Sequence, residues 1–150
     1  MTTETALLVA RGLGSCVAIG LWDPLSHAGG LSHVLLPSIE MSVFRDSPHK
    51  FADRSVPLMV RELRRKGAPV ERLVAKIVGG AQMFNPKGLS HGGVLRIGER
   101  NVTAVREQLA AVGVPIVGED VGGTVGRTVA FSTSDGSMTI TTIESPPRIL

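Results

Sequence analysis

Cys16 is the single cysteine of the chain, and it directly follows the glycine-rich stretch Gly12-Leu13-Gly14-Ser15. A thiolate is a strong nucleophile, so a cysteine beside a general base can attack a carboxamide or ester carbon. Glycine-rich backbone can approach a substrate closely and point N–H groups at a developing oxyanion. Free cysteines are also commonly buried for packing alone. Two interpretations stay open: a nucleophile with an oxyanion or substrate loop at Gly12, Gly14 and Ser15, or a structural cysteine.

His33 is the histidine that lies inside an apolar, strand-like run, which covers residues 29–36. A buried imidazole needs a hydrogen-bond partner. If this strand pairs with the one predicted over residues 15–21, His33 could face Cys16 and act as its general base. The alternative is a core histidine whose ring nitrogens are satisfied by neighbouring groups.

The other histidines and a pair of carboxylates are weaker candidates. His27, His49 and His91 fall in predicted turns or loops, and their spacing suggests no metal site. Glu119 and Asp120 are adjacent, so in an extended chain their side chains point to opposite sides. They would make a poor general acid–base pair. We expect neither a metal nor a cofactor.

Two loops could line a site, because each follows a predicted strand. They cover residues 79–84 and 119–123, and either could equally be only a turn.

The composition predicts one compact domain over residues 1–150, with 43% hydrophobic and 19% charged residues. The net charge is +3, but no Lys/Arg run is interleaved with aromatic residues, which argues against a nucleic-acid partner. The basic stretch at residues 61–66 is expected to be the solvated face of a helix.

A lone cysteine excludes an intramolecular disulfide and disfavours a cysteine-based zinc site. The N-terminus lacks the pattern of a secretion signal, and no apolar segment approaches the roughly 20 residues that span a bilayer. We therefore expect a cytoplasmic protein without membrane insertion, where a reducing environment keeps the thiol usable.

Apolar runs bounded by turn residues predict strands over residues 15–21, 29–36, 73–78, 114–118, 127–132 and 138–142. Helical spacing predicts helices over residues 50–66 and 97–112, and the first is expected to begin near Ser55 so that Pro57 lies in its first turn. This order predicts an α/β (α+β) fold: a single-domain sandwich with a mainly β core and two long helices packed on one side.

Turn chemistry predicts how these elements are connected. We expect a turn at residues 11–14, a loop over residues 82–93, and a type I′ hairpin at Asp135-Gly136. From Glu144 onward the chain, with two consecutive prolines, is predicted to be a tail.

Together these segments resemble the CheD family of chemoreceptor glutamine deamidases. The matching stretches follow the family's order and span most of the chain. They are GLGSC at residues 12–16, GGLSHVLLP at 29–37, KFAD at 50–53, VGGAQMF at 78–84, IGERNV at 97–102 and GEDVGGTVGRTV at 118–129.

The resemblance implies a sandwich related to the catalytic domains of glutamine-deamidating bacterial toxins, and a Cys-His-Thr catalytic group. Cys16 and His33 match the first two members of this group. The family's threonine lies six positions before the cysteine, where this chain has Ala10. An alanine cannot orient an imidazole by a hydrogen bond, so no third residue is carried over.

The implied activity is hydrolysis of glutamine side chains of methyl-accepting chemotaxis receptors to glutamate, with methylglutamate esters as a plausible second substrate. A CheC-type phosphatase is a further partner found in some members. The rival hypothesis is a weakly active or inactive CheD-like binding module that docks on chemoreceptors or on a CheC-type phosphatase. Ala10 favours the rival hypothesis, and the Cys16–His33 pair argues against it.

Overall fold

The computed structural model describes residues 1–83 and 96–150. The predicted loop at residues 82–93, with His91, lies mostly outside the described residues. The strands of the described part are β1 Leu7–Leu13, β2 Val17–Trp22, β3 Gly29–Val34, β4 Val74–Gly79, β5 Ile116–Val121, β6 Arg127–Ser132, β7 Met138–Thr141 and β8 Arg148–Ile149. The α-helices are α1 Ala52–Arg65 and α2 Ile97–Ala111.

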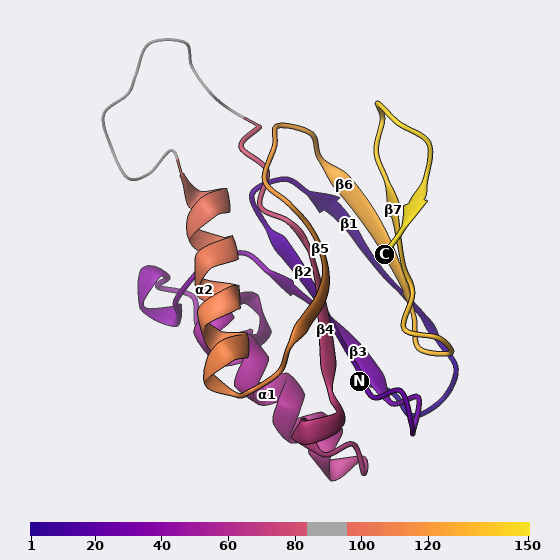
Figure 1. The fold of residues 1–150 in the computed structure, drawn as a ribbon. Coiled ribbons are helices and arrows are strands. Elements are labelled where there is room, and N and C mark those ends of the chain that lie inside the picture. The colour runs from indigo at the N-terminus through magenta and orange to yellow at the C-terminus, as the bar shows by residue number, and fades with distance from the viewer. Residues whose placement is uncertain (84–95) are drawn as a thin grey trace, which may run out of the picture.

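The strands form two sheets that pack face to face (Figure 1). The inner sheet has the order β3-β2-β4-β5, and the outer sheet has the order β1-β6-β7-β8. Neighbouring strands are antiparallel except β4 and β5, which run parallel and are connected through α2. Both helices cover the face of the inner sheet that points away from the outer sheet (Figure 1). The predicted sandwich with two helices on one side is confirmed.

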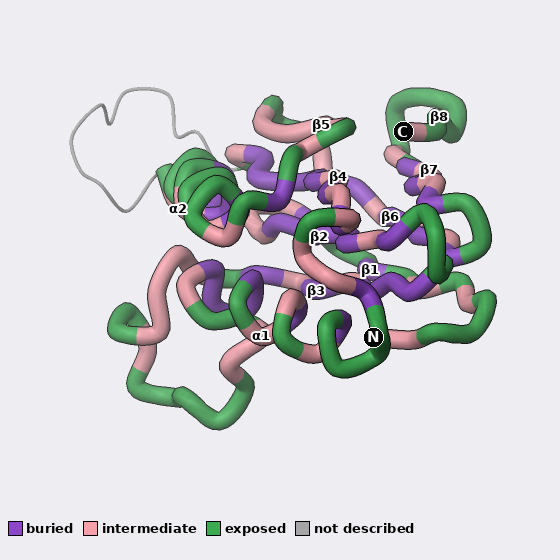
Figure 2. The backbone as a smooth tube through the Cα atoms, turned by 60° about the horizontal axis from the view of Figure 1, so that its bottom comes forward, coloured by how far each residue is buried: buried purple, intermediate pink, exposed green. Residues whose placement is uncertain are grey.

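Two apolar layers lie on the two faces of the inner sheet, and alternation along its strands fills both. Val17, Ile19 and Leu21 of β2 pack with the helices, whereas Ala18 packs with the outer sheet. Figure 2 shows the buried backbone concentrated in the sheets and the inward sides of the helices. We call the layer between the two sheets the inter-sheet layer, because the candidate site lies in it.

Helix α1 begins earlier than the sequence predicts. The backbone N–H of Ala52 donates to the Leu36 carbonyl at 3.0 Å, and that of Asp53 donates to the Pro37 carbonyl at 3.2 Å. The first backbone N–H groups of a helix have no partner within the helix, and here two of them are satisfied by carbonyls of the chain that follows β3. This support starts the helix at Ala52, so Pro57 lies in its second turn rather than its first.

Two other boundary predictions are wrong because ladder pairing extends past the apolar runs. β1 continues through Leu13, with a register irregularity after Ala10 and a left-handed Gly12 at φ +68°, instead of turning at residues 11–14. The predicted tail contains β8, which pairs with β7 and is held by paired backbone bonds between Met138 and Leu150.

The β6–β7 hairpin is present, but its turn type differs from the prediction. A type I′ turn needs positive φ at both central residues. Gly136 has φ +70°, whereas Asp135 is not left-handed. The hairpin instead closes around residues 133–136, with Ser132 donating to the Ser137 carbonyl at 2.9 Å.

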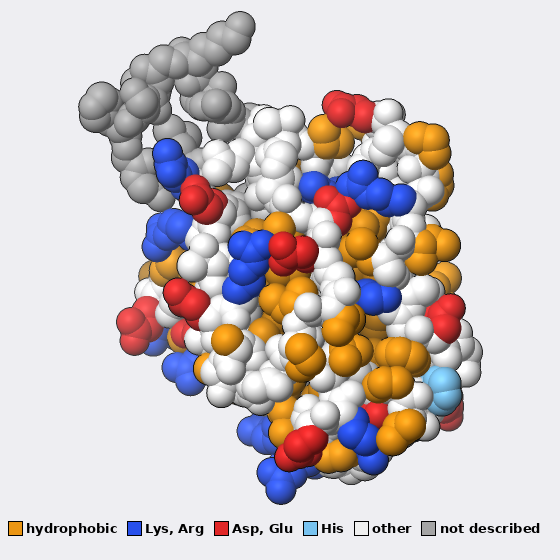
Figure 3. Space-filling view, viewed as in Figure 1, with side chains coloured by type: hydrophobic (Ala, Val, Ile, Leu, Met, Phe, Trp, Pro, Cys, Tyr) orange, Lys and Arg blue, Asp and Glu red, His pale blue; other side chains and the backbone are white. Residues whose placement is uncertain are grey.

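The described surface carries both signs of charge. Figure 3 shows Lys and Arg side chains interspersed with Asp and Glu on one face. Arg106 pairs with Glu119 at 2.8 Å, and Arg148 pairs with Asp120. Within residues 1–83 and 96–150, no helix combines the length and apolar character that a bilayer span requires.

Candidate active site

Cys16 directly precedes β2, at the end of the chain segment that crosses from the outer sheet to the inner one. It is half-buried and packs against the inter-sheet layer. The connection between the two strands is short, because only Gly14, Ser15 and Cys16 lie between Leu13, the last residue of β1, and the start of β2. The thiol is therefore fixed at the entrance of the layer and not on a long surface loop.

The end of β4 holds the backbone around Cys16. The N–H of Gly80 donates to the Cys16 carbonyl, and the N–H of Ala81 donates to the Gly14 carbonyl, both at 2.8 Å. Gly79 comes so close that an added Cβ would lie 2.2 Å from the Cys16 carbonyl oxygen. The predicted loop at residues 79–84 thus supports the nucleophile segment, as far as it is described.

The carbonyls of residues 14–16 are all engaged, since Asn101 donates to Ser15 at 2.9 Å. The N–H groups of Ser15 and Cys16 donate to no backbone carbonyl among the described residues, and the Cys16 N–H lies beside the residue's own thiol. Successive free N–H groups beside a thiol are the geometry that an oxyanion hole needs. Gly12 lies within β1, three residues before Ser15, and supplies a left-handed bend at φ +68°. The N–H of Gly14 donates to the Gly12 carbonyl at 3.0 Å, so it is already engaged.

His33 lies on β3, directly opposite Ala18 of β2. Ala18 and Leu31, which share its side of the inner sheet, both belong to the inter-sheet layer, so the His33 imidazole faces the same layer. Extending the register by one residue places Cys16 opposite Leu35 and diagonal to His33. Diagonal neighbours in antiparallel sheets have Cα atoms about 7–8 Å apart, within reach of long side chains.

Burial shifts both titrating groups toward their neutral forms. It raises the pKa of the Cys16 thiol, which the residue's own backbone N–H only partly offsets, and it lowers the pKa of the His33 imidazole. The buried Nε2 of His33 has no hydrogen-bond partner among the described residues. The resting site thus pairs a thiol with a neutral imidazole that is able to accept a proton.

A hollow of about 640 Å³ opens beside His33. Its walls include Met1, Leu31, Leu35 and residues 46–50. The hollow follows the edge of β3 that does not pair with β2. Thr2 pairs with this edge at Gly29 and Lys50 pairs just beyond it at Leu35, so the stretch around His33 between them stays open.

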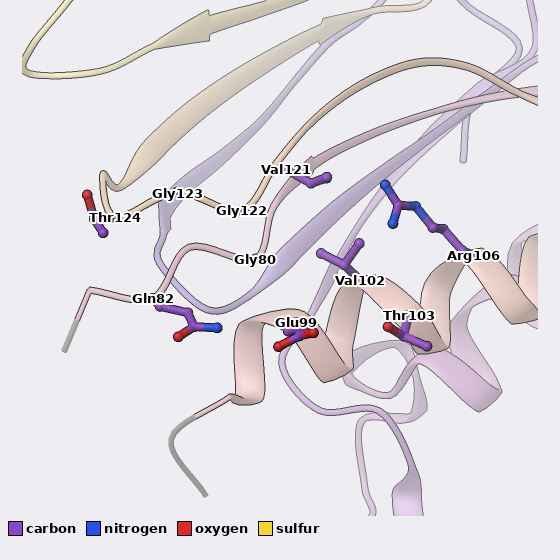
Figure 4. A pocket seen from close by; sticks show the side chains of 10 residues that line it. All are labelled: Gly80, Gln82, Glu99, Val102, Thr103, Arg106, Val121, Gly122, Gly123 and Thr124. Atoms are coloured by element: carbon purple, nitrogen blue, oxygen red, sulfur yellow. The ribbon is translucent and has the colours of Figure 1, made fainter. Parts of the chain in front are cut away.

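A second hollow, of about 440 Å³, lies between the start of α2 and the ends of β4 and β5 (Figure 4). Gly80, Val102 and Gly122 are among its walls, but neither Cys16 nor His33 is. We assign no chemistry to it.

The weaker candidates are placed as structural residues. Glu119 and Asp120 lie within β5, not in a loop after a strand. Their side chains point to opposite sides, as expected: Glu119 pairs with Arg106 of α2, and Asp120 pairs with Arg127 of β6 at 2.9 Å. In the part of the chain that the structure describes, no group of His, Cys, Asp and Glu residues is arranged to hold a metal ion.

Comparison with known proteins identifies the family. A family model described as CheD chemotactic sensory transduction matches residues 35–142. A Geobacter metallireducens protein named probable chemoreceptor glutamine deamidase CheD 2 is 46% identical over 152 residues, covering 100% of this chain and 92% of its own. A Desulforamulus reducens protein named probable chemoreceptor glutamine deamidase CheD is 45% identical over 143 residues, covering 95% of this chain and 85% of its own. This chain belongs to the CheD family.

In the CheD family, Ala10 occupies the position where the resemblance predicts the catalytic threonine. Ala10 is 6% exposed and belongs to the inter-sheet layer, on β1, which lies against β3. The position where the family resemblance predicts a threonine therefore faces the same layer as Cys16 and His33. The structure brings the three positions to one layer, and this CheD chain lacks a hydroxyl at one of them.

Sequence reasoning missed Asn101, the fifth residue of α2. It is fully buried and bonds to the segments that carry Cys16 and His33. The available signal was an amide on the inward face of a helix, next to Val102 and within the CheD-like IGERNV stretch. A buried polar side chain on an otherwise apolar stripe needs partners, and these partners lie far away in sequence.

Proposed function

We propose that this chain deamidates chemoreceptor glutamines with Cys16 as the nucleophile and His33 as the general base. The observation that supports the mechanism best is the diagonal placement of the two residues on one face of the inner sheet. The activity itself follows from the CheD family, whose relatives are named for deamidating chemoreceptor glutamines.

The proposed reaction begins when neutral His33 takes the proton of the Cys16 thiol. The thiolate attacks the side-chain carboxamide carbon, and the N–H groups of Ser15 and Cys16 hold the negative oxygen. Protonated His33 then gives its proton to the departing amide nitrogen, so ammonia leaves and a thioester remains. His33 next activates a water molecule, which cleaves the thioester and releases glutamate and the free thiol. The net change is one water consumed and one ammonia released.

A methylglutamate ester would enter the same path. The thiolate would attack the ester carbon, and methanol would leave in place of ammonia. The hollow beside His33 is our candidate entrance for either side chain, because His33 is one of its walls at the free edge of β3, although Cys16 is not among its walls. Each conversion adds a carboxylate to the receptor and so changes its local charge.

We further propose a cytoplasmic location, one CheD-like domain over residues 1–150, and a CheC-type phosphatase as a second partner. The location follows from the receptors' cytoplasmic glutamines and the unpaired thiol. The phosphatase is proposed only from the family resemblance.

The rival function is a binding module with little catalysis, which Ala10 favours. Mass spectrometry of a chemoreceptor fragment before and after incubation separates the two. Exchange of NH₂ for OH adds about one dalton per glutamine. Our proposal predicts this increment with catalytic amounts of the protein, whereas binding to the fragment without any increment would support the rival.

A further inference from the structure

Asn101 connects the two halves of the candidate site. Its amide nitrogen donates to the Ser15 carbonyl at 2.9 Å and to the Leu35 carbonyl at 3.0 Å. Ser15 precedes Cys16, and Leu35 lies two residues beyond His33. One side chain on α2 thus joins the segment that carries the thiol to the residue directly after the strand that carries the imidazole.

The chemistry of the two partners fixes the orientation of this amide. Both are carbonyl oxygens, which accept hydrogen bonds, so the NH₂ group of Asn101 must face them. The side chain is fully buried, and its Oδ1 has no partner among the described residues. An apolar residue would avoid that unpaired acceptor. The amide therefore serves through its two donors and not through packing.

Close backbone contact brings α2 near enough for these bonds. A Cβ at Gly98 would lie 2.5 Å from the Gly80 carbonyl oxygen, and a Cβ at Gly80 would lie 2.3 Å from Val102. Figure 4 shows Gly80, which follows β4, beside Val102, which lies on the first turns of α2. Because Gly80 also donates to the Cys16 carbonyl, the end of β4 contacts both the helix and the nucleophile segment.

We propose that Asn101 is a positioning residue that keeps Cys16 and His33 in reactive register. This inference rests on the proposed Cys–His mechanism. A small misplacement of reacting groups can slow a reaction by about 10²-fold without weakening substrate binding. Loss of the two donors should therefore act on kcat and leave KM nearly unchanged.

The test is a double-mutant cycle on the alkylation of Cys16 by iodoacetamide near neutral pH. If Asn101 acts by aligning the imidazole with the thiol, Asn101→Leu and His33→Ala remove the same interaction. Their effects on the alkylation rate should then be non-additive, with the double variant as slow as His33→Ala alone. On a receptor fragment, Asn101→Leu should lower kcat by roughly 10–100-fold and change KM less than about twofold.

The matched control is Thr133→Val. Thr133 is also buried and holds Glu4 and Ala6 through its hydroxyl, but it lies beyond β6 at the other end of β1. The Thr133→Val substitution should lower the free energy of unfolding without changing the alkylation rate. Combined with His33→Ala, it should therefore give the alkylation rate of His33→Ala alone, with no coupling. The alkylation rate and kcat of Asn101→Ser, which keeps one donor group, should fall between those of wild type and Asn101→Leu. If Asn101→Leu does not fold, Asn101→Ser takes its place in the cycle.

Additive effects, or a kcat in the Asn101 variants equal to that of the Thr133 control, would overturn the positioning role. A wild-type protein that alkylates normally but never deamidates would instead contradict the proposed function. The alkylation cycle needs no substrate, so it still decides the role of Asn101 in that case.

Discussion

The thiol and the imidazole of this site are both driven toward their neutral forms by burial, which raises the pKa of Cys16 and lowers that of His33. A thiolate–imidazolium pair is therefore not favoured at rest, unlike in sites where a nearby charge stabilises the thiolate. The proton must pass to His33 before the thiolate attacks, so the rate depends on how well His33 is aligned with Cys16.

His33 should set the acid limb of the pH profile. The base works only when unprotonated, and burial lowers its pKa below the ordinary 6.5, so the limb should lie below pH 6.5. The measurement is kcat/KM on a receptor fragment between about pH 5 and pH 8. His33→Ala should slow turnover by roughly 10²–10⁴-fold. An acid limb above the ordinary imidazole value, or an unchanged rate in His33→Ala, would remove His33 from this role.

Ala10→Thr should increase activity. The change would place a hydroxyl in the inter-sheet layer that His33 faces, where the imidazole Nε2 has no partner among the described residues. A hydroxyl bonded to the ring would fix its orientation, which raises kcat more than it changes KM. The comparison is kcat of the two proteins on one fragment. No gain, or a loss from crowding a packed strand, would show that the prediction is wrong.

At the scale of elements, the end of β4 is as important to the site as the strands that carry Cys16 and His33. Gly79 adopts φ +125°, and its missing side chain lets the chain pass beside the Cys16 carbonyl. Gly80 then donates to that carbonyl. The pair of glycines sets the position of the nucleophile from a strand remote in sequence.

Gly79→Ala should therefore abolish most activity. Its Cβ would lie 2.2 Å from the Cys16 carbonyl oxygen, so the nucleophile segment must move. Gly67→Ala is the control, since Gly67 also has positive φ, at +87°, but open space around it. The control should lose about 1–2 kcal/mol of unfolding free energy and keep its kcat. Equal kcat values in the two variants, measured on one receptor fragment, would contradict the positioning by β4.

The sequence predicts the elements that depend on local patterns. The pairing of β2 with β3 follows from two apolar runs joined by the short connection at residues 23–27, and α2 follows from its helical spacing. Cys16 and His33 are predicted by the motifs around them, not by periodicity. The missed features depend on contacts between remote segments: the Asn101 bonds, the start of α1 at Ala52, and the pairing of β8.

At the scale of the whole molecule, the site lies at one end of β2, and an ion pair with a buried carboxylate lies at the other. Asp23, which follows β2, is fully buried and accepts hydrogen bonds from Arg72 and Ser26. Burial alone would raise its pKa, but these bonds, together with the N–H of Leu25 and the charge of Arg72, lower it to about 2. This pair ties the β2–β3 connection to the segment before β4.

The Asp23 carboxylate should make stability depend on pH in the acid range. Its pKa falls from 3.8 to about 2 on folding, so its contribution is complete above pH 3.8 and is lost as pH falls toward 2. The shift corresponds to about 2 kcal/mol of unfolding free energy. Denaturant unfolding of wild type and Asp23→Asn should differ by this amount at neutral pH and converge below pH 2. The exposed Glu107→Gln is the control, and a difference independent of pH would contradict the assignment.

The central claim is that Cys16 performs the deamidation, and the most direct measurement is the turnover of Cys16→Ala on a chemoreceptor fragment, followed by mass spectrometry. The thiol is half-buried and has no structural bond to lose among the described residues, so the variant should fold like wild type by circular dichroism. We expect no increment in fragment mass with Cys16→Ala, under conditions where wild type adds about one dalton per glutamine. Wild-type turnover by the folded variant would contradict it.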